Sequence, residues 1–582
     1  MNANVVRIVG PTEVMVIVAV IGVGCAWFVT TAWKARSASW SFKHFFLGGR
    51  NIGPELTQQS NWGLTFAWAN GIWFFAVLGY SYGPGVILLQ IPWCVSVAVL
   101  AALLRQIMRA AKDSTIHGYL GATYGSKARQ FACIATSIGY VFNCGFEMFW
   151  ASRMFSLSLG LPKLVYPAAI SLSALCGAYC MVGGYIANCR TDKHQNILGM
   201  FAITAVCAAC GFGIWGRPGV AVGLLALAGV CLVYAALAFY VPRARPSNAE
   251  RLQNIVALTS IPLVFAIAAV LVWRTNADSG VGDPASPIHL FACSMPPWQL
   301  IAGITVFQLF FNFVDMANWQ TISANAEIPP EDYTKLRWSF VRSAIYMLWF
   351  PALCGILVGC FLRIIPKLTD DGIFPAAFAQ VFPEAGGVVR GVIVGLVMLG
   401  LFSTSLSSAD TYLMAAAHTL SWDLFRHNEY VRIIALPQES SDRLEAEADF
   451  CDKVRTKLIF LAVGMTLVFA LFHFFWPDTV FAFQFIMYGS ALALLPGVAY
   501  ALKLQGKNRQ PAAELGPWIV ASIIAGIVAA LLPYLWIYLI AHVDTSSLTP
   551  IFTLSASAVF FGIGWLRHRK SSKAIPHHED TL

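Results

Sequence analysis

Apolar runs long enough to cross a bilayer recur along the whole chain, and they restrict its fold more than any other feature. A helix needs about 20 apolar residues to span the hydrocarbon core, where its backbone must satisfy its own hydrogen bonds. The usual hydropathy criterion finds about fifteen such runs. They are Pro11–Trp33, Leu56–Tyr80, Pro84–Gln106, Gln130–Leu159, Leu161–Gly183, His194–Trp215, Val220–Val241, Asn254–Trp273, Pro297–Gln320, Ser339–Leu362, Val388–Phe425, Leu458–Trp476, Val480–Leu502, Gly516–Ile540 and Pro550–Trp565. The sequence therefore predicts an all-α membrane protein in contact with a lipid bilayer.

Composition and charge agree with this class. Of 582 residues, 58% are hydrophobic and only 12% are charged, whereas soluble proteins carry roughly a quarter charged residues. Basic residues gather in alternate loops, as Arg105, Arg109 and Lys112 do after the third span. The positive-inside rule then places the N-terminus outside and the C-terminus in the cytoplasm, in the plasma membrane. The net charge of +9 follows from this asymmetry, so no nucleic-acid partner is expected, and the oligomeric state is left open.

One span has a polar centre. The stretch from Gly391 to Phe425 carries Ser403, Thr404, Ser405, Ser407, Ser408, Asp410 and Thr411. Such groups are costly in a bilayer unless they face a partner helix, a cavity or an ion, and hydroxyls are hard oxygen ligands for small cations. Thr404, Ser407, Ser408 and Thr411 share one helical face. The pattern indicates a cation site; the alternative is that these hydroxyls bond only their own helix.

Two further features interrupt apolar spans. Asn70-Gly71 lies midway through Leu56–Tyr80, where glycine weakens a helix by roughly 1 kcal/mol relative to alanine and local unwinding would expose carbonyls. Glu147 lies deep in Gln130–Leu159, and an intramembrane carboxylate is a functional hypothesis by default. Pairing with Arg153, or a hydrogen bond from a hydroxyl, would satisfy it equally.

Enzymatic and metal chemistry find no support in the sequence. The fourteen cysteines lie mostly inside spans, where they act as small packing residues. Cys207 and Cys210 form a CxxC without a second pair or histidine set. There is no HExxH and no Ser-His set at matched depth, so an enzyme is not expected, and neither is a cofactor.

Several motifs together resemble the sodium:solute symporter family from about Phe45 to about Leu502. They are Phe45–Arg50, Tyr80–Gly83, Gly183-Gly184 with Thr191-Asp192 and Gln195, Asp315 with Trp319-Gln320, and Ser407–Thr411 with Trp422–Leu424. Each is weak by itself, whereas their order and spacing are specific. Thr321 departs from the family's pattern, which has an arginine there. The run Phe66–Asn70 resembles the urea-transporting branch.

The resemblance implies a five-plus-five inverted-repeat (LeuT-like) core, in which five helices recur upside down. The expected divisions are residues 1–55 (N-terminal helix and cytoplasmic loop), 56–218 (first repeat), 219–296 (inserted helix pair and outer loop), 297–505 (second repeat) and 506–582 (C-terminal helices and tail). Within the second repeat, the longest polar insert runs from His427 to Lys457. Asp449 and Lys453 at i, i+4 predict a short surface helix in it.

The resemblance also implies a sodium ion between the broken helix and the serine-rich helix. Its ligands would be the carbonyls near Leu64 and Ala67, the carbonyl of Thr404, and the hydroxyls of Ser407 and Ser408.

The solute would bind beside this ion. The candidate contacts are Trp68, Asn70, Trp73, Gln90, Glu147 and Asn312. Asp315 is a candidate gate or structural partner. Asp410 is a candidate for a second cation or a proton, or for a cap on a neighbouring helix.

We therefore expect a sodium-coupled symporter that imports a small polar organic solute by alternating access. The alternatives are a proton-coupled carrier, with Glu147 or Asp410 as the titrating group, and a membrane sensor that keeps the transporter fold. Amino acids, sugars, carboxylates and nucleobases all remain open as solutes.

Overall fold

The computed structural model describes nine stretches of the chain. They are residues 10–36, 41–111, 115–215, 293–381, 387–438, 440–475, 480–507, 513–536 and 545–574. Within them the regular structure is helical. The predicted inserted pair, Val220–Val241 and Asn254–Trp273, lies outside the described residues, and each of the other predicted spans falls on helices.

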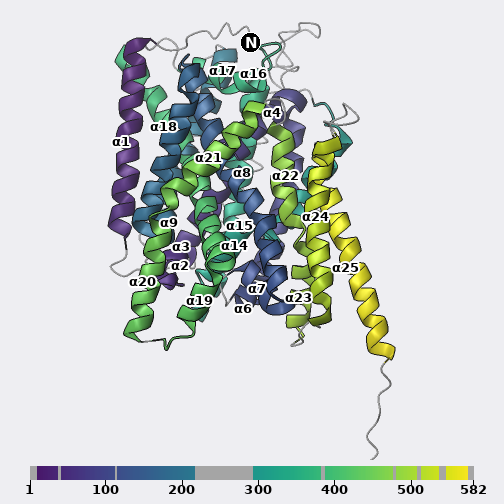
Figure 1. The fold of residues 1–582 in the computed structure, drawn as a ribbon. Helices are drawn as coiled ribbons and strands as arrows, with labels where there is room; N and C mark the ends of the chain where they lie inside the picture. The colour runs from purple at the N-terminus through teal and green to yellow at the C-terminus, as the bar shows by residue number, and fades with distance from the viewer. Residues whose placement is uncertain are drawn as a thin grey trace, which may run out of the picture.

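The helices run mostly along one direction (Figure 1). The N-terminal half holds α1 (Pro11–Ala35), α2 (Phe42–Leu47), α3 (Gly53–Thr65), α4 (Phe74–Tyr82), α5 (Ile91–Ala102), α6 (Leu104–Ala110), α7 (Ile116–Tyr124), α8 (Ser126–Ser158) and α9 (Val165–Trp215). The C-terminal half holds α13 (Trp298–Phe310), α14 (Met316–Ser323), α15 (Tyr333–Met347), α16 (Gly355–Leu362), α17 (Ile373–Ala379), α18 (Gly387–His418), α19 (His427–Ile434), α20 (Ser441–Arg455), α21 (Leu458–Phe475), α22 (Val480–Leu492), α23 (Leu495–Gln505), α24 (Gly516–Trp536) and α25 (Thr549–Ala574). Among the described residues, nine helices are long and apolar enough to cross a membrane, or ten with one bent pair counted as a span.

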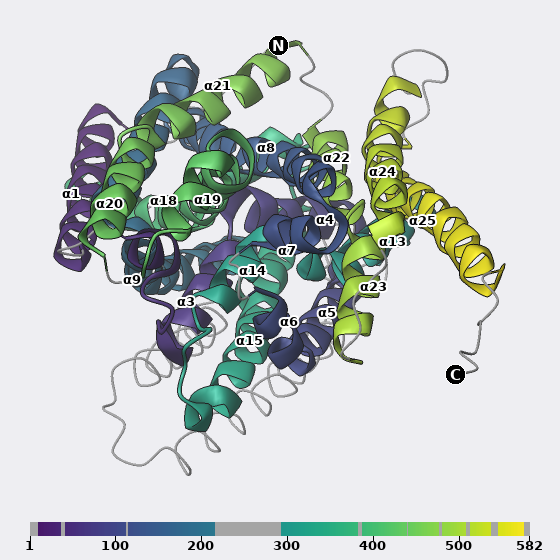
Figure 2. The same cartoon turned by 60° about the horizontal axis from the view of Figure 1, so that its bottom comes forward.

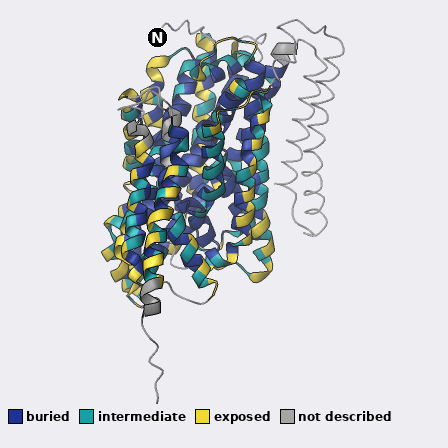
Figure 3. Ribbon diagram, turned by 90° about the vertical axis from the view of Figure 1, so that its right-hand side faces the viewer, coloured by how far each residue is buried: buried dark blue, intermediate teal, exposed yellow. Residues whose placement is uncertain are grey.

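The serine-rich helix α18 lies at the centre of this bundle. It packs against α9, α8, α3 and α1, and every residue from Val397 to His418 is buried. α1 and the pair α24 and α25 stand at opposite sides of the bundle (Figure 2). Their outward faces are exposed, and Figure 3 shows this for the side that holds α25. The polar side chains of α18 therefore face protein.

The predicted span Leu56–Tyr80 is broken, but not where the sequence suggested. α3 ends at Thr65, and Phe66 (φ −85°, ψ 60°) and Ala67 (φ −94°, ψ 144°) leave the helix before a π-helical segment, η1 (Trp68–Trp73), begins. The two halves are bent by 56°. Gly71 lies inside η1, where a Cβ would stand 3.3 Å from the Thr65 carbonyl oxygen. Its missing side chain thus permits a close approach and does not mark the break.

A second irregularity lies in α9, in which two helices meet at a kink. Gly184 turns the chain with φ 58° and ψ −155°, a conformation open mainly to glycine. A Cβ there would stand 2.7 Å from the Phe45 carbonyl oxygen. The residues after this kink, which lie between two predicted spans, are helical, and residues 185–193 are buried except for Ile186, Arg190 and Lys193.

The polar insert after α18 is ordered as well. α18 continues into a π-helical segment, η9 (Thr419–Phe425), and α19 and α20 follow. The predicted surface helix is confirmed: Asp449 and Lys453 on α20 form a 2.5 Å ion pair.

Candidate functional site

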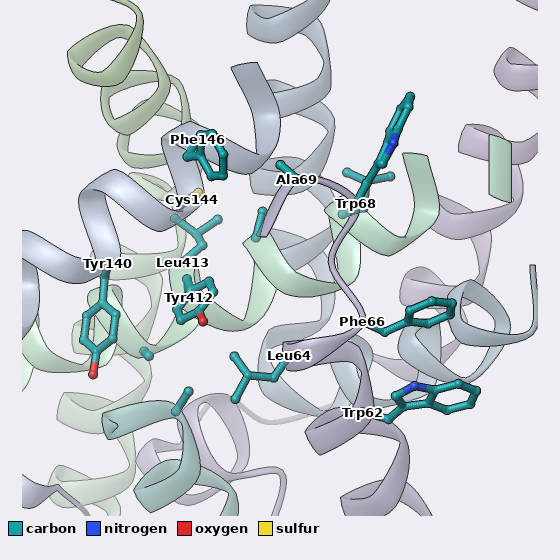
Figure 4. Packing of buried hydrophobic residues seen from close by; sticks show 14 of the residues in the cluster. Trp62, Leu64, Phe66, Trp68, Ala69, Tyr140, Cys144, Phe146, Tyr412 and Leu413 are labelled. Carbon is teal, nitrogen blue, oxygen red and sulfur yellow. The ribbon is translucent and has the colours of Figure 1, made fainter. Parts of the chain in front are cut away.

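Ser408 of α18 contacts the broken end of α3. Its hydroxyl donates to the carbonyl oxygens of Gly63, at 2.9 Å, and Leu64, at 3.1 Å. In a continuous α-helix these oxygens would accept from the peptide N–H groups of residues 67 and 68. Because the chain is extended there, both carbonyls need another partner. Figure 4 shows Leu64 and Phe66 at this break, with Tyr412 of α18 nearby.

Ser407, the neighbouring residue, contacts α9. Its hydroxyl donates to Oδ1 of Asp192 at 2.5 Å, while Oδ2 of Asp192 is buried without a hydrogen-bond partner. Asp192 falls between the predicted spans Leu161–Gly183 and His194–Trp215, so the sequence predicts no site role for it. The rule that flags intramembrane carboxylates finds it once a helix is known to follow the Gly184 kink directly. Two hydroxyls, two carbonyls and a carboxylate thus lie close together around Gly63.

The resemblance implies the carbonyls of Thr404 and Ala67 as further ligands, while Thr411 only shares the helical face of the serines. The hydroxyl of Thr404 bonds the Leu401 carbonyl of its own helix at 2.8 Å, and that of Thr411 bonds the Ser407 carbonyl at 3.0 Å. The Ala67 carbonyl accepts from the N–H of Ile72 at 2.9 Å. The alternative of bonding within the helix therefore holds for the two threonine hydroxyls, and the carbonyls beside Ser408 are those of Gly63 and Leu64.

Glu147 of α8 connects three elements. Its carboxylate accepts from the backbone N–H groups of Ala69, at 3.1 Å, and Asn70, at 2.6 Å, at the start of η1. It also accepts from the Ser405 hydroxyl of α18 at 2.9 Å. A carboxylate at a helix N-terminus is stabilised by the unpaired N–H groups there. The sequence left two partners open for Glu147, Arg153 or a hydroxyl, and the structure shows the hydroxyl of Ser405.

Arg153 pairs elsewhere. Its Nε lies 3.1 Å from Oδ2 of Asp371, in a bidentate contact between α8 and the segment after α16. The indole N–H of Trp73 donates to the Asp370 carbonyl in the same segment, at 3.0 Å. Burial and the charge of Asp371 raise the pKa of Asp370. This segment closes one end of the bundle over η1.

A cavity opens beside the break. It measures about 80 Å³ as the space open to the centre of a water-sized sphere. Its lining comes from the broken helix, η2 (Pro84–Gln90), α5, α13, α15, α18 and α22. Of the predicted solute contacts, Asn70 and Gln90 line it, and so does Asp315. The predicted cation-site residues Leu64 and Ala67 line its wall, so ion site and cavity are adjacent.

The remaining predicted contacts lie off the cavity. Trp68 packs edge-on against Phe374, Phe378 and Phe402. Asn312 donates to the Ser96 hydroxyl at 3.2 Å. Trp73 and Glu147 make the contacts given above, and none of these four is a lining residue.

Sequence reasoning missed two glutamines that line the cavity. Gln308 of α13 donates to Oε1 of Gln90 at 2.7 Å, and Gln484 of α22 donates to Oδ1 of Asn70 at 3.0 Å. Nε2 of Gln90 and the Oε1 atoms of Gln308 and Gln484 are buried without partners. A single glutamine in an apolar span has no periodicity to reveal which way it points.

The two candidate aspartates have structural contacts. Asp315 caps α14 by accepting from the N–H of Ala317 at 3.1 Å, and its Oδ2 is unpartnered. Asp410 accepts from the hydroxyl of Tyr179 at 2.6 Å and from that of Thr411 at 3.2 Å. Asp410 thus ties α18 to α9, away from the cavity.

Comparison with solved structures agrees with this architecture. The fold aligns with a Na⁺-coupled sialic acid symporter in a substrate-bound, outward-open state, with TM-score 0.61 and 14% identity over 95% of this chain and 97% of the other. MhsT bound to L-phenylalanine aligns with TM-score 0.44 and 12% identity over 89% and 99%. A search of curated proteins by sequence finds no significant match. The first alignment shows the inverted-repeat transporter fold.

A family comparison covers part of the chain. Residues 45–268 match the model of the sodium:solute symporter family, so over these residues the chain is similar to that family. The predicted resemblance and the predicted fold class are confirmed.

Proposed function

We propose that sodium binds between the broken end of α3 and the serine pair of α18. The ligands would be the carbonyls of Gly63 and Leu64, the hydroxyls of Ser407 and Ser408, and the carboxylate of Asp192. Oxygen-only sets of this kind suit hard cations. The observation that carries the proposal is the Ser408 hydroxyl, which lies within hydrogen-bond distance of both carbonyls. An ion bound there would fix the bend of the broken helix against α18.

We propose in addition that the solute binds in the adjacent cavity and is small, polar and without net negative charge. None of the lining residues that the structure describes is Arg, Lys or His, while Asp315 is among them. A buried anion would find the adjacent sodium ion as its counter-charge and no cationic side chain in this lining, while Asp315 would repel it. The chemistry of the lining thus favours amides, ureas, neutral sugars, nucleobases and amines over carboxylates.

The unpaired glutamine atoms refine this class. The pair Gln90 and Gln308 leaves one donor and one acceptor unused, and exchanging O and N in both amides gives the same result. A buried polar group without a partner costs roughly 1–3 kcal/mol, so a solute that bonds both atoms gains affinity. Aromatic residues that line the cavity, among them Phe74, Trp93 and Phe307, would cover the apolar face of such a solute. A solute with both donors and acceptors fits this wall.

Transport would follow from sodium binding at the hinge. Ser408 holds the end of α3 and Glu147 holds the start of η1, so an ion there stabilises one arrangement of the two helix halves. The membrane potential supplies about 2.3 kcal/mol per charge per 100 mV. With the N-terminus outside, as the loop charges predict, sodium and solute would move together into the cytoplasm across the plasma membrane.

A thermal-shift screen tests this proposal. The purified chain is heated with small solutes, each in sodium and in matched potassium. Stabilisation by neutral donor–acceptor solutes in sodium alone supports it. Uptake into proteoliposomes then tests coupling: uptake driven by a pH gradient without sodium would contradict it and select proton coupling. Stabilisation by carboxylates but by no neutral solute would contradict the solute class.

A further inference from the structure

Three side chains of types that commonly bind transition metals lie close together just beyond the C-terminal end of α18. They are His117 of α7, Cys133 of α8 and Asp423 of η9, and their ligand atoms all lie within 4.8 Å of one another. All three residues are buried. α7 and α19 lie together at this end of the bundle (Figures 1 and 2). The cluster is separate from the sodium site, since Asp423 follows Ser408 by fifteen residues (423 minus 408), about 22 Å along a helix.

The imidazole of His117 is held by a hydroxyl on one side. Its Nε2 lies 2.7 Å from Oγ1 of Thr136, and that hydroxyl donates to the carbonyls of Ala132, at 3.2 Å, and Cys133, at 3.3 Å. A hydroxyl has one proton to give. A proton on Nδ1 would let Thr136 donate to Nε2. In the other tautomer the backbone carbonyls take the hydroxyl proton, Thr136 accepts from Nε2–H, and the lone pair of the neutral ring lies on Nδ1.

That lone pair faces a carboxylate. Nδ1 of His117 and Oδ2 of Asp423 are 3.3 Å apart, yet neither atom has a hydrogen-bond partner. Two lone pairs at this distance repel each other unless a positive charge lies between them. Either a proton or a metal ion supplies that charge, and Cys133 places a thiol at the same point.

We propose that His117, Cys133 and Asp423 bind a divalent transition-metal ion of the zinc class. Imidazole, thiolate and carboxylate are the ordinary ligands of zinc, with bonds of about 2.0–2.3 Å. Ligand atoms in such a site are roughly 3.3–3.8 Å apart, so the cluster needs a contraction of about 1 Å at most. Thr136 on Nε2 matches the outer contact that metal-binding histidines make.

The surroundings suit a site that forms with the fold. Arg129 of α8 donates from Nε to the Asp423 backbone carbonyl at 3.1 Å and also contacts His427. The three ligands come from α7, α8 and η9, so the metal would hold the end of the serine-rich helix to the two helices beside it. This proposal does not depend on the sodium site.

Metal content of the full chain tests the site. All proteins carry His577→Ala and His578→Ala, so that the histidines of the tail do not bind metal. After chelation and reloading with zinc, we expect one zinc per chain in this background and in the control Cys144→Ser, which removes another buried cysteine of α8. Cys133→Ser, His117→Gln and Asp423→Asn should each bind at least tenfold more weakly. Cobalt should give a thiolate charge-transfer band that Cys133→Ser removes and Cys144→Ser keeps.

Stability of the unmutated ligand set gives a second readout, in case the variants fold poorly. Zinc should raise the melting temperature of the background protein above its value in chelator. No bound zinc and no such shift would overturn the proposal and leave a protonated His117–Asp423 pair. Full zinc binding in Cys133→Ser would also overturn it.

Discussion

The carboxylate of Glu147 accepts a 2.6 Å hydrogen bond from the backbone N–H of Asn70. Through this bond Glu147 of α8 caps η1, the second half of the broken helix. Ser405 of α18 donates to the same carboxylate. The break is thus held from one side by Glu147 and from the other by Ser408. Both contacts involve backbone that an unbroken helix would have satisfied itself.

Glu147→Gln is expected to destabilise the fold. Glutamine offers one acceptor oxygen and places an NH₂ group against a backbone N–H. Hydrogen bonds to charged groups contribute about 1.5–3 kcal/mol each, so the free energy of unfolding should fall by about 2 kcal/mol or more. Ser405→Ala removes a single contact and should cost less. Thermal melts in detergent rank the two variants, and an effect of Ser405→Ala equal to or above that of Glu147→Gln would contradict the capping role.

Gly63→Ala should impair sodium binding. An added Cβ would stand 2.1 Å from Oγ of Ser407 and 3.1 Å from Oδ1 of Asp192, so those oxygens must move. Overpacking of this kind costs about 1–3 kcal/mol. Gly464→Ala is the matched control, because a Cβ there meets no atom within 4 Å. Sodium-dependent thermal stabilisation should be lost in the first variant and kept in the second; equal behaviour would contradict the placement of the ion.

Gln308→Leu should separate solute binding from sodium binding. The change removes the bond to Gln90 and the free acceptor of the cavity wall. A solute that stabilises the wild type in sodium should then bind at least tenfold more weakly, while the response to sodium alone persists. Thermal titration measures both. An unchanged solute affinity would place the solute elsewhere.

Asp370→Asn should stabilise the protein at neutral pH and have no effect in acid. Burial and Asp371 raise the pKa of Asp370 above its ordinary value of about 3.9. Neutral Asp370 fits the fold better than the charged form does. Its contribution to stability is therefore fully present below the ordinary pKa and is lost as the pH rises through the raised pKa. Asparagine keeps the neutral form at every pH. Melting temperatures of both proteins across this pH range test the sign, and a constant difference at all pH values would contradict it.

The sequence predicts the serine-rich helix well because its information is local. Helical spacing alone places Ser407 and Ser408 on one face, and the family motif then assigns them to the ion. Asp192 is missed for the converse reason: the charged residues beside it, Arg190 and Lys193, resemble a loop, and only the structure shows that a helix runs from the kink at Gly184 through Asp192. The direction of Trp68, Gln308 and Gln484 is set by helices distant in sequence, so no local pattern reveals it.

The location of the break also depends on packing. Asn70-Gly71 is the weakest local point of the helix, yet the chain opens at Phe66, whose ring stacks on Trp62 with centroids 5.2 Å apart. Gly71 instead lies near Thr65 and Pro351. Intrinsic propensity is a weak prior that tertiary contacts override.

Equilibrium binding of radioactive sodium to the purified protein tests the central claim most directly, since it requires no knowledge of the solute. Ser408→Ala is compared with the wild type and with Ser152→Ala, a buried serine that bonds only the Met148 carbonyl of its own helix at 2.7 Å. The account predicts saturable sodium binding in the wild type and in Ser152→Ala, weakened at least tenfold in Ser408→Ala. Undiminished binding in Ser408→Ala would contradict it.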